Sequence, residues 1–171
     1  MKTKPSKMLI AGGLVLGAVL IASKGLASNA GFAPIVSPQR LRNDSSGGGS
    51  FGASRDGGTR AHNGTDLLVT PGQSIRTPFA ATVVRYAIPY ANDSRYSGVL
   101  LQGVGAMAAY QVKIFYLSPT VQPGQFLPQG AQVGTAQKIS TKYGGGMKDH
   151  VHVEVYRNGT LINPATVLNI V

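Results

Sequence analysis

The stretch HVHVEVY, residues 150–156, alternates polar side chains with valines. In a β-strand, side chains two residues apart point to the same face of the sheet. The pattern therefore predicts a strand that carries His150 and His152 on one face and packs three valines on the other. Such alternation is typical of an antiparallel sheet with one face open to solvent.

Four other short runs share the richness in β-branched and aromatic residues, and turn residues (Pro, Gly, Asn, Asp) separate them: Phe79–Tyr86, Gly98–Val104, Tyr110–Leu117 and Gln132–Ala136. The 171-residue chain also holds 23 Gly and 10 Pro, which disfavour helices. We therefore expect residues 54–171 to form one mainly β domain, a small antiparallel sheet with little helix.

The first 30 residues have the pattern of an export signal or a membrane anchor. Lys2, Lys4 and Lys7 precede an uncharged apolar run, Met8–Ala22. Its length suits the apolar region of a signal peptide, whereas a spanning helix usually needs about 20 residues. A cleaved signal and a retained hydrophobic helix both remain open, and both place the rest of the chain outside the cytoplasm.

Residues 31–53 are rich in Gly, Ser and Pro, with the run SSGGGS at 45–50, and predict a flexible linker. The formal net charge is +10, yet the basic residues of 54–171 occur singly. Because a nucleic-acid-binding module needs clustered basic and stacking aromatic residues, we do not expect a nucleic-acid partner.

All three histidines fall in two short motifs, His62-Asn63-Gly64-Thr65-Asp66 and the pair at 150 and 152. Gly64 permits a left-handed backbone, so the first motif can bend its two end side chains toward one ion. The chain has no cysteine, so any metal must use imidazole and carboxylate ligands. Two imidazoles and one carboxylate are a common catalytic zinc set, with a fourth position left for water or substrate.

Residues 54–168 resemble the lysostaphin-type peptidoglycan endopeptidases. The resemblance lies in the first histidine motif and HVHVE at 150–154, and also in GQSIRTP at 72–78, PGQ at 123–125 leading to QVG at 132–134, and a terminal Asn163-Pro164. It implies that His62, Asp66 and His152 bind one Zn²⁺, and that His150 is catalytic rather than a ligand.

The chain departs from this family after the strand predicted at Tyr110–Leu117, where active members usually carry a further histidine. Here the sequence reads IFYLSP at 114–119, similar to leukocyte cell-derived chemotaxin, a secreted zinc-binding relative regarded as lacking peptidase activity. Tyr116, near the missing histidine, is either a catalytic donor to a developing oxyanion or a packed strand aromatic.

The resemblance implies a zinc metalloendopeptidase that hydrolyses peptide crosslinks of bacterial peptidoglycan, in wall remodelling or phage entry. The alternative is a catalytically inactive zinc-binding module that recognises cell wall or a protein. The expected location is extracytoplasmic, in the bacterial envelope or a virion membrane. Peptidoglycan is the expected partner, together with a membrane if residues 1–30 are retained.

Overall fold

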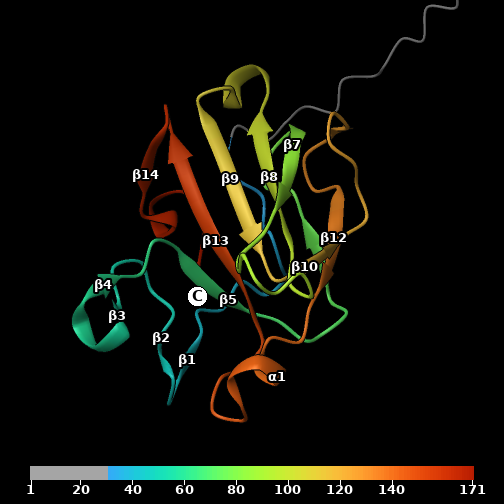
Figure 1. The fold of residues 1–171 in the computed structure, drawn as a ribbon. Coiled ribbons are helices and arrows are strands. Elements are labelled where there is room, and N and C mark those ends of the chain that lie inside the picture. The colour runs from blue at the N-terminus through green and yellow to red at the C-terminus, as the bar shows by residue number, and fades with distance from the viewer. Residues whose placement is uncertain (1–30) are drawn as a thin grey trace, which may run out of the picture.

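The computed structural model describes residues 31–171, in which an antiparallel sheet of seven strands is the largest element. Figure 1 shows its long strands side by side, with β5 next to β13. In sheet order the strands are β11 (Phe126–Leu127), β7 (Ala81–Ala87), β8 (Gly98–Gly103), β9 (Tyr110–Phe115), β13 (His150–Arg157) and β14 (Thr160–Ile162), and β5 (Thr65–Leu68) also pairs with β13.

The other elements are short. A second antiparallel sheet has the order β10 (Leu117–Pro119), β12 (Gln132–Ala136) and β6 (Ser74–Arg76). Two small pairs lie near the start, β1 (Asn43–Asp44) with β2 (Gly47–Gly48) and β3 (Ser54–Arg55) with β4 (Arg60–Ala61). The helices are α1 (Ser140–Tyr143) and the 3-10 turns η1 (Asp56–Gly58), η2 (Gly105–Met107) and η3 (Pro164–Thr166). The expected mainly β, antiparallel fold with little helix is confirmed.

One face of the large sheet is packed, and the other carries polar side chains. Val151, Val153 and Val155 are fully buried and join the core cluster, as the alternating pattern predicted. Opposite them in register, β9 contributes Val112 and Ile114 to the same core. His150, His152 and Glu154 therefore project from the other face, where they are available for a site.

Residues 31–53, predicted from composition to be a linker, pack against the domain. Ile35 and Val36 belong to the core, and Arg42 is only 2% exposed. Backbone hydrogen bonds join this segment to β5, from Arg42 N to Asp66 O at 2.9 Å and from Leu68 N to Arg40 O at 2.8 Å. The segment therefore lies beside β5, where it can brace the residues of that strand.

The predicted signal peptide or membrane anchor, residues 1–30, lies outside the described residues. Within residues 31–171, no helix has the length and apolar character needed to cross a membrane.

Candidate metal centre

The pairing of β5 with β13 brings the two histidine motifs together. Asp66 lies directly opposite His152 in this antiparallel register, and residues directly opposite share one face of the sheet. Asp66 Oδ1 lies 3.0 Å from His152 Nδ1 and 3.1 Å from His62 Nε2. The two ring nitrogens are 2.9 Å apart, so three donor atoms form a compact triangle.

Outer hydrogen bonds fix which ring nitrogen faces this triangle. His62 Nδ1 donates to the carbonyl oxygen of Ser50 at 2.8 Å, which leaves Nε2 with a lone pair. His152 Nε2 donates to a carboxylate oxygen of Glu154 at 3.4 Å, which leaves Nδ1 with a lone pair. Two nitrogen lone pairs and a carboxylate oxygen then face one another, so this arrangement needs a positive charge between them, either a proton or a metal ion.

Two arginines hold the outer oxygen of the Asp66 carboxylate. Oδ2 accepts hydrogen bonds from Arg42 Nε and Nη2 at 3.2 and 3.1 Å and from Arg55 Nη2 at 3.3 Å. Burial alone would raise the pKa of Asp66, but hydrogen bonds from His152 and His62 lower it far below its usual value. Asp66 is therefore an anion whose second oxygen, Oδ1, faces the two imidazoles, and a metal ion bound there would replace the protons that they share with it.

The chemistry and spacing of these donors fit zinc. Ligands at the corners of a tetrahedron around zinc, each about 2.0–2.1 Å from the ion, lie about 3.3 Å from each other. The three observed separations, 2.9, 3.0 and 3.1 Å, are close to that value without rearrangement of the backbone. The arrangement is the one expected of a zinc centre, and the roles of His62, Asp66 and His152 as ligands stay a prediction.

Gly64 has a different role from the one expected. Its φ is not among the positive values of the chain, so no left-handed backbone is needed there. Instead, a Cβ at this position would lie 2.7 Å from the His152 ring and would also clash with the carbonyl oxygen of Val153. Gly64 therefore allows the first motif to approach β13 closely.

His150 lies beside the triangle and faces the same side. Its Nδ1 donates to the Lys148 carbonyl at 2.8 Å, and its Nε2 lies 3.9 Å from Asp66 Oδ1. Burial lowers the pKa of His150, so the ring is neutral near pH 7 and Nε2 carries a lone pair. A neutral imidazole beside a metal centre is a suitable proton acceptor.

Tyr116 does not continue the strand predicted over Tyr110–Leu117. The residue has a φ of 66° and separates β9 from β10, a left-handed backbone that is uncommon for a residue other than glycine. Its ring stands edge-on to His150, with the centroids 5.3 Å apart. Burial raises the pKa of Tyr116 to about 12, so its hydroxyl keeps its proton. The Tyr116 ring is partly buried, as expected of a packed strand aromatic, and it also lines the site, as expected of a catalytic donor. Both interpretations of Tyr116 therefore stay open.

A polar cluster on β13 and β9 contacts the outer nitrogen of His152, Nε2. Lys113 Nζ lies 2.5 Å from Glu154 Oε2, and the Tyr156 hydroxyl also donates to that oxygen. Burial alone would raise the pKa of Glu154, but hydrogen bonds from His152 and Lys113 lower it to about 2. Glu154 is thus a fixed anion that accepts the outer proton of His152, an arrangement typical of metal-binding histidines.

The donor triangle opens into a cavity of about 630 Å³. Besides the three donors and the neighbouring His150 and Tyr116, its walls include Arg60 of the β3–β4 hairpin, and Tyr90 and Tyr143 from two other segments. Sequence reasoning did not identify Arg42, Arg55, Ser50, Lys113 or these two tyrosines. Their positions carry no periodic or motif signal, and only the fold brings them to the site.

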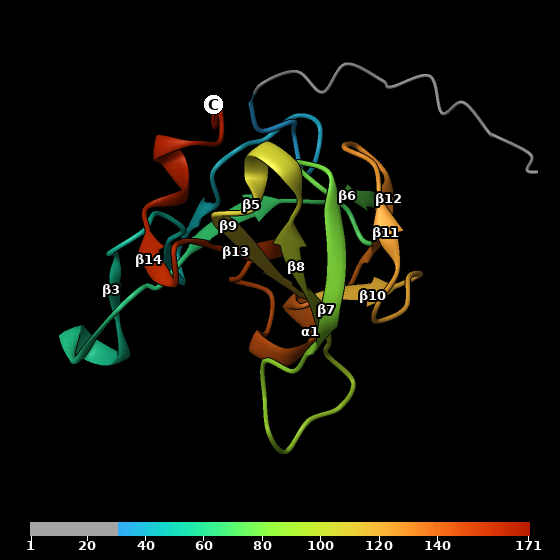
Figure 2. The same ribbon diagram turned by 90° about the horizontal axis from the view of Figure 1, so that it is seen from above.

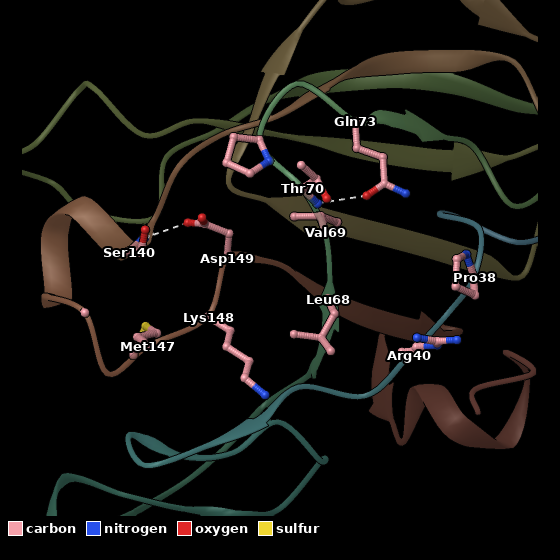
Figure 3. Close-up of a pocket in the computed structure, with 12 residues that line it drawn as sticks. Pro38, Arg40, Leu68, Val69, Thr70, Gln73, Ser140, Met147, Lys148 and Asp149 are labelled. Carbon is pink, nitrogen blue, oxygen red and sulfur yellow. Dashed lines mark hydrogen bonds between the residues drawn. The ribbon is translucent and has the colours of Figure 1, made fainter.

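A second cavity, of about 700 Å³, lies beside the far end of β5 (Figure 3). Leu68, Val69 and Lys148 line it, and Met147 lines both cavities. Here the Asp149 carboxylate accepts a hydrogen bond from the Ser140 backbone amide at 2.8 Å (Figure 3). That bond ties the start of α1 to the start of β13 and so fixes the loop that precedes His150.

Comparisons with known proteins identify the family of this domain. A family model, Peptidase family M23, matches residues 60–164, which span both histidine motifs. Leukocyte cell-derived chemotaxin-2 of Mus musculus is 35% identical over 112 residues, 65% of this chain and 69% of that protein. An uncharacterized metalloprotease of Haemophilus influenzae is 30% identical over 112 residues, 65% of this chain but 22% of that protein.

Solved structures share the fold at low identity. A zinc-containing peptidase from Vibrio cholerae superposes with a TM-score of 0.54 and 19% identity, over 80% of this chain and 38% of the other. The solution structure of lysostaphin gives a TM-score of 0.53 and 17% identity, over 74% of this chain and 52% of the other. The chain thus spans about half or less of these two proteins.

Proposed function

This chain belongs to peptidase family M23, and on that premise we propose that it is a zinc metalloendopeptidase that hydrolyses peptide crosslinks of bacterial peptidoglycan. The observation that carries the proposal is the triangle of His62 Nε2, Asp66 Oδ1 and His152 Nδ1, with separations of 2.9–3.1 Å at the base of an open cavity. The likeness of its fold to those of a zinc-containing peptidase and of lysostaphin supports the proposal.

In this proposal, His62, Asp66 and His152 hold the ion and His150 moves protons. Zinc bound there would polarise the scissile carbonyl and increase the acidity of water. The neutral His150 presents Nε2 to the same cavity, because its Nδ1 is committed to the Lys148 carbonyl. His150 would accept a proton from the attacking water and return it to the leaving amine.

Tyr116 would supply the donor that the usual second histidine provides in active members of the family. Its hydroxyl keeps its proton, and its ring borders the same cavity as His150. A neutral phenol can donate to the oxygen that gains negative charge as the carbonyl is attacked. The proposal thus assigns Tyr116 to stabilisation of charge rather than to proton abstraction.

The place of action would be outside the cytoplasm, where peptidoglycan lies. The sequence pattern of residues 1–30, typical of an export signal or a membrane anchor, supports this placement. A retained N-terminal segment would hold the domain at a membrane, whereas a cleaved one would release it.

A second candidate function is zinc-dependent binding without hydrolysis. The observations that favour it are Tyr116 in the region of the missing histidine and the 35% identity to leukocyte cell-derived chemotaxin-2. In that case the cavity would recognise wall fragments or a protein, and the ion would fix its shape.

Digestion of purified murein separates the two functions. The zinc-loaded protein is incubated with sacculi of several crosslink types, and newly released amino ends are counted. Hydrolysis predicts release that is lost in His150→Ala, while binding of the protein to sacculi persists. If the wild-type protein binds sacculi but releases no amino ends from any of them, zinc-dependent binding without hydrolysis replaces the proposed hydrolysis.

A further inference from the structure

Three tyrosine hydroxyls form a chain along one wall of the cavity. The Tyr90 hydroxyl lies 2.9 Å from that of Tyr116 and 2.8 Å from that of Tyr143. Tyr90 belongs to the β7–β8 loop, residues 88–97, whereas Tyr143 is the last residue of α1. All three residues line the cavity of the donor triangle.

The chain of three tyrosine hydroxyls runs from solvent toward the interior of the cavity. Tyr143 is 48% exposed, whereas Tyr116 is half-buried against the His150 ring. Each phenol has one proton, so the order of donation along the chain has two directions. If Tyr143 donates to Tyr90 and Tyr90 donates to Tyr116, the Tyr116 proton is left for an acceptor inside the cavity. In the opposite direction the cavity receives only a lone pair.

Contacts between the β7–β8 loop and α1 hold the middle of this chain in place. Lys142 Nζ lies 2.9 Å from Asp93 Oδ2 and 4.3 Å from the centroid of the Tyr90 ring. Figure 2 shows this loop lying beside α1. Together with the Tyr90–Tyr143 hydrogen bond, these two contacts join the loop to α1 at three points. The Tyr90 hydroxyl therefore has a fixed position between its partners.

The inner end of the chain is fixed as well. The left-handed backbone of Tyr116 is held by its amide, which donates to the Ser97 carbonyl at 2.8 Å, and by its carbonyl, which accepts from Gln137 N at 2.8 Å. A residue held in a rare backbone conformation by its surroundings is often one whose side chain is positioned for function. Burial raises the pKa of Tyr90 as well as that of Tyr116, so both phenols remain donors.

We propose that Tyr90 is a positioning residue that, supported by Tyr143, donates to the Tyr116 hydroxyl and so directs the Tyr116 proton at the carbonyl oxygen of a bound peptide. This inference rests on the proposed hydrolysis. A donor that itself accepts a hydrogen bond is polarised and donates more strongly. The chain would therefore compensate for the weak acidity of a phenol where related enzymes use histidine.

The test compares Tyr90→Phe with Tyr96→Phe in the full zinc-loaded protein. Tyr96 is a matched control, because its ring packs on both Tyr90 and Tyr116 while its hydroxyl has no hydrogen-bond partner within residues 31–171. We expect Tyr90→Phe to lower kcat for murein about 10-fold with KM unchanged, since the lost bond acts on the transition state. Tyr143→Phe should give a smaller loss in the same direction, and Tyr96→Phe should stay within about twofold of wild type.

A binding measurement makes the test independent of turnover. An alanyl-alanine phosphinate, whose tetrahedral oxyanion imitates the attacked carbonyl, should bind Tyr90→Phe about 10-fold more weakly than Tyr96→Phe. Equal phosphinate affinities for these two variants would overturn the positioning role, even if murein is cleaved. Weaker binding by Tyr90→Phe without any murein cleavage would uphold the tyrosine chain while refuting the proposed hydrolysis. A wild-type protein that neither binds phosphinate nor cleaves murein would overturn both.

Discussion

Asp66 and His152 lie opposite each other in the β5–β13 ladder, with Oδ1 3.0 Å from Nδ1. The rigid part of the fold therefore sets their separation, and only His62 reaches the triangle from outside a strand. Two of the three predicted ligands are thus fixed by the same hydrogen-bonded pair of strands that buries the valines of β13.

Replacement of Asp66 by Asn should abolish tight zinc binding. The amide has no negative charge, and it cannot accept from the two arginines and bind an ion in the way the carboxylate does. The loss should exceed the roughly 10–100-fold that removal of an outer partner typically costs. Zinc titration against a competing chelator measures it, with Asp56→Asn on the exposed β3–β4 hairpin as control. Stoichiometric zinc in Asp66→Asn would contradict the assigned centre.

Graded changes at Glu154 should reduce zinc affinity in order. Glu154→Gln keeps an acceptor for His152 Nε2 but loses the charge, whereas Glu154→Ala leaves that nitrogen without the acceptor. We expect a modest loss for Gln and a loss of about 10–100-fold for Ala. The same chelator competition measures both, and Tyr156→Phe serves as a control that keeps the carboxylate. Equal affinities across the series would assign Glu154 a role on the strand surface only.

A methyl group at Gly64 should disturb both folding and metal binding. The added Cβ of Gly64→Ala would meet the His152 ring at 2.7 Å, and the backbone of β13 cannot easily move away. Overpacking of this kind typically costs about 1–3 kcal/mol. Urea unfolding of the metal-free protein gives the stability, and Gly145→Ala is the control because nothing lies within 4 Å of its Cβ. A Gly64→Ala protein as stable as that control would refute the close-approach argument.

Ile35 should contribute to stability like any core residue, although it lies in the predicted linker. Its side chain is fully buried, so Ile35→Ala should lower the free energy of unfolding by about 2–5 kcal/mol. The same substitution at Ile88, which is 64% exposed, should change it by less than about 0.5 kcal/mol. Urea denaturation of the two variants makes the comparison, and equal stabilities would mean that residues 31–53 behave as a free tether.

Alternation predicted the main strands of the sheet correctly, and motif spacing predicted that His62, Asp66 and His152 would lie together. The period-two pattern at 150–156 places two histidines and a glutamate on one face, and five strands lie close to the predicted runs. The surroundings of the site could not be predicted in this way. Arg42 contacts Asp66 across 24 residues, and Tyr90 meets Tyr143 across 53, so neither pair has a local signal. The burial of Ile35 could not be predicted either, because a Pro- and Gly-rich segment has the same composition whether or not it packs on a sheet.

The two guanidinium groups on Asp66 Oδ2 affect which cation the proposed metal centre would select. With that oxygen occupied by Arg42 and Arg55, the carboxylate can offer a single oxygen and cannot chelate through both. Calcium takes six to eight oxygen ligands and often grips a carboxylate in bidentate fashion. A protein working in calcium-rich surroundings would thereby keep its centre for a small, nitrogen-preferring ion without needing extreme affinity for it.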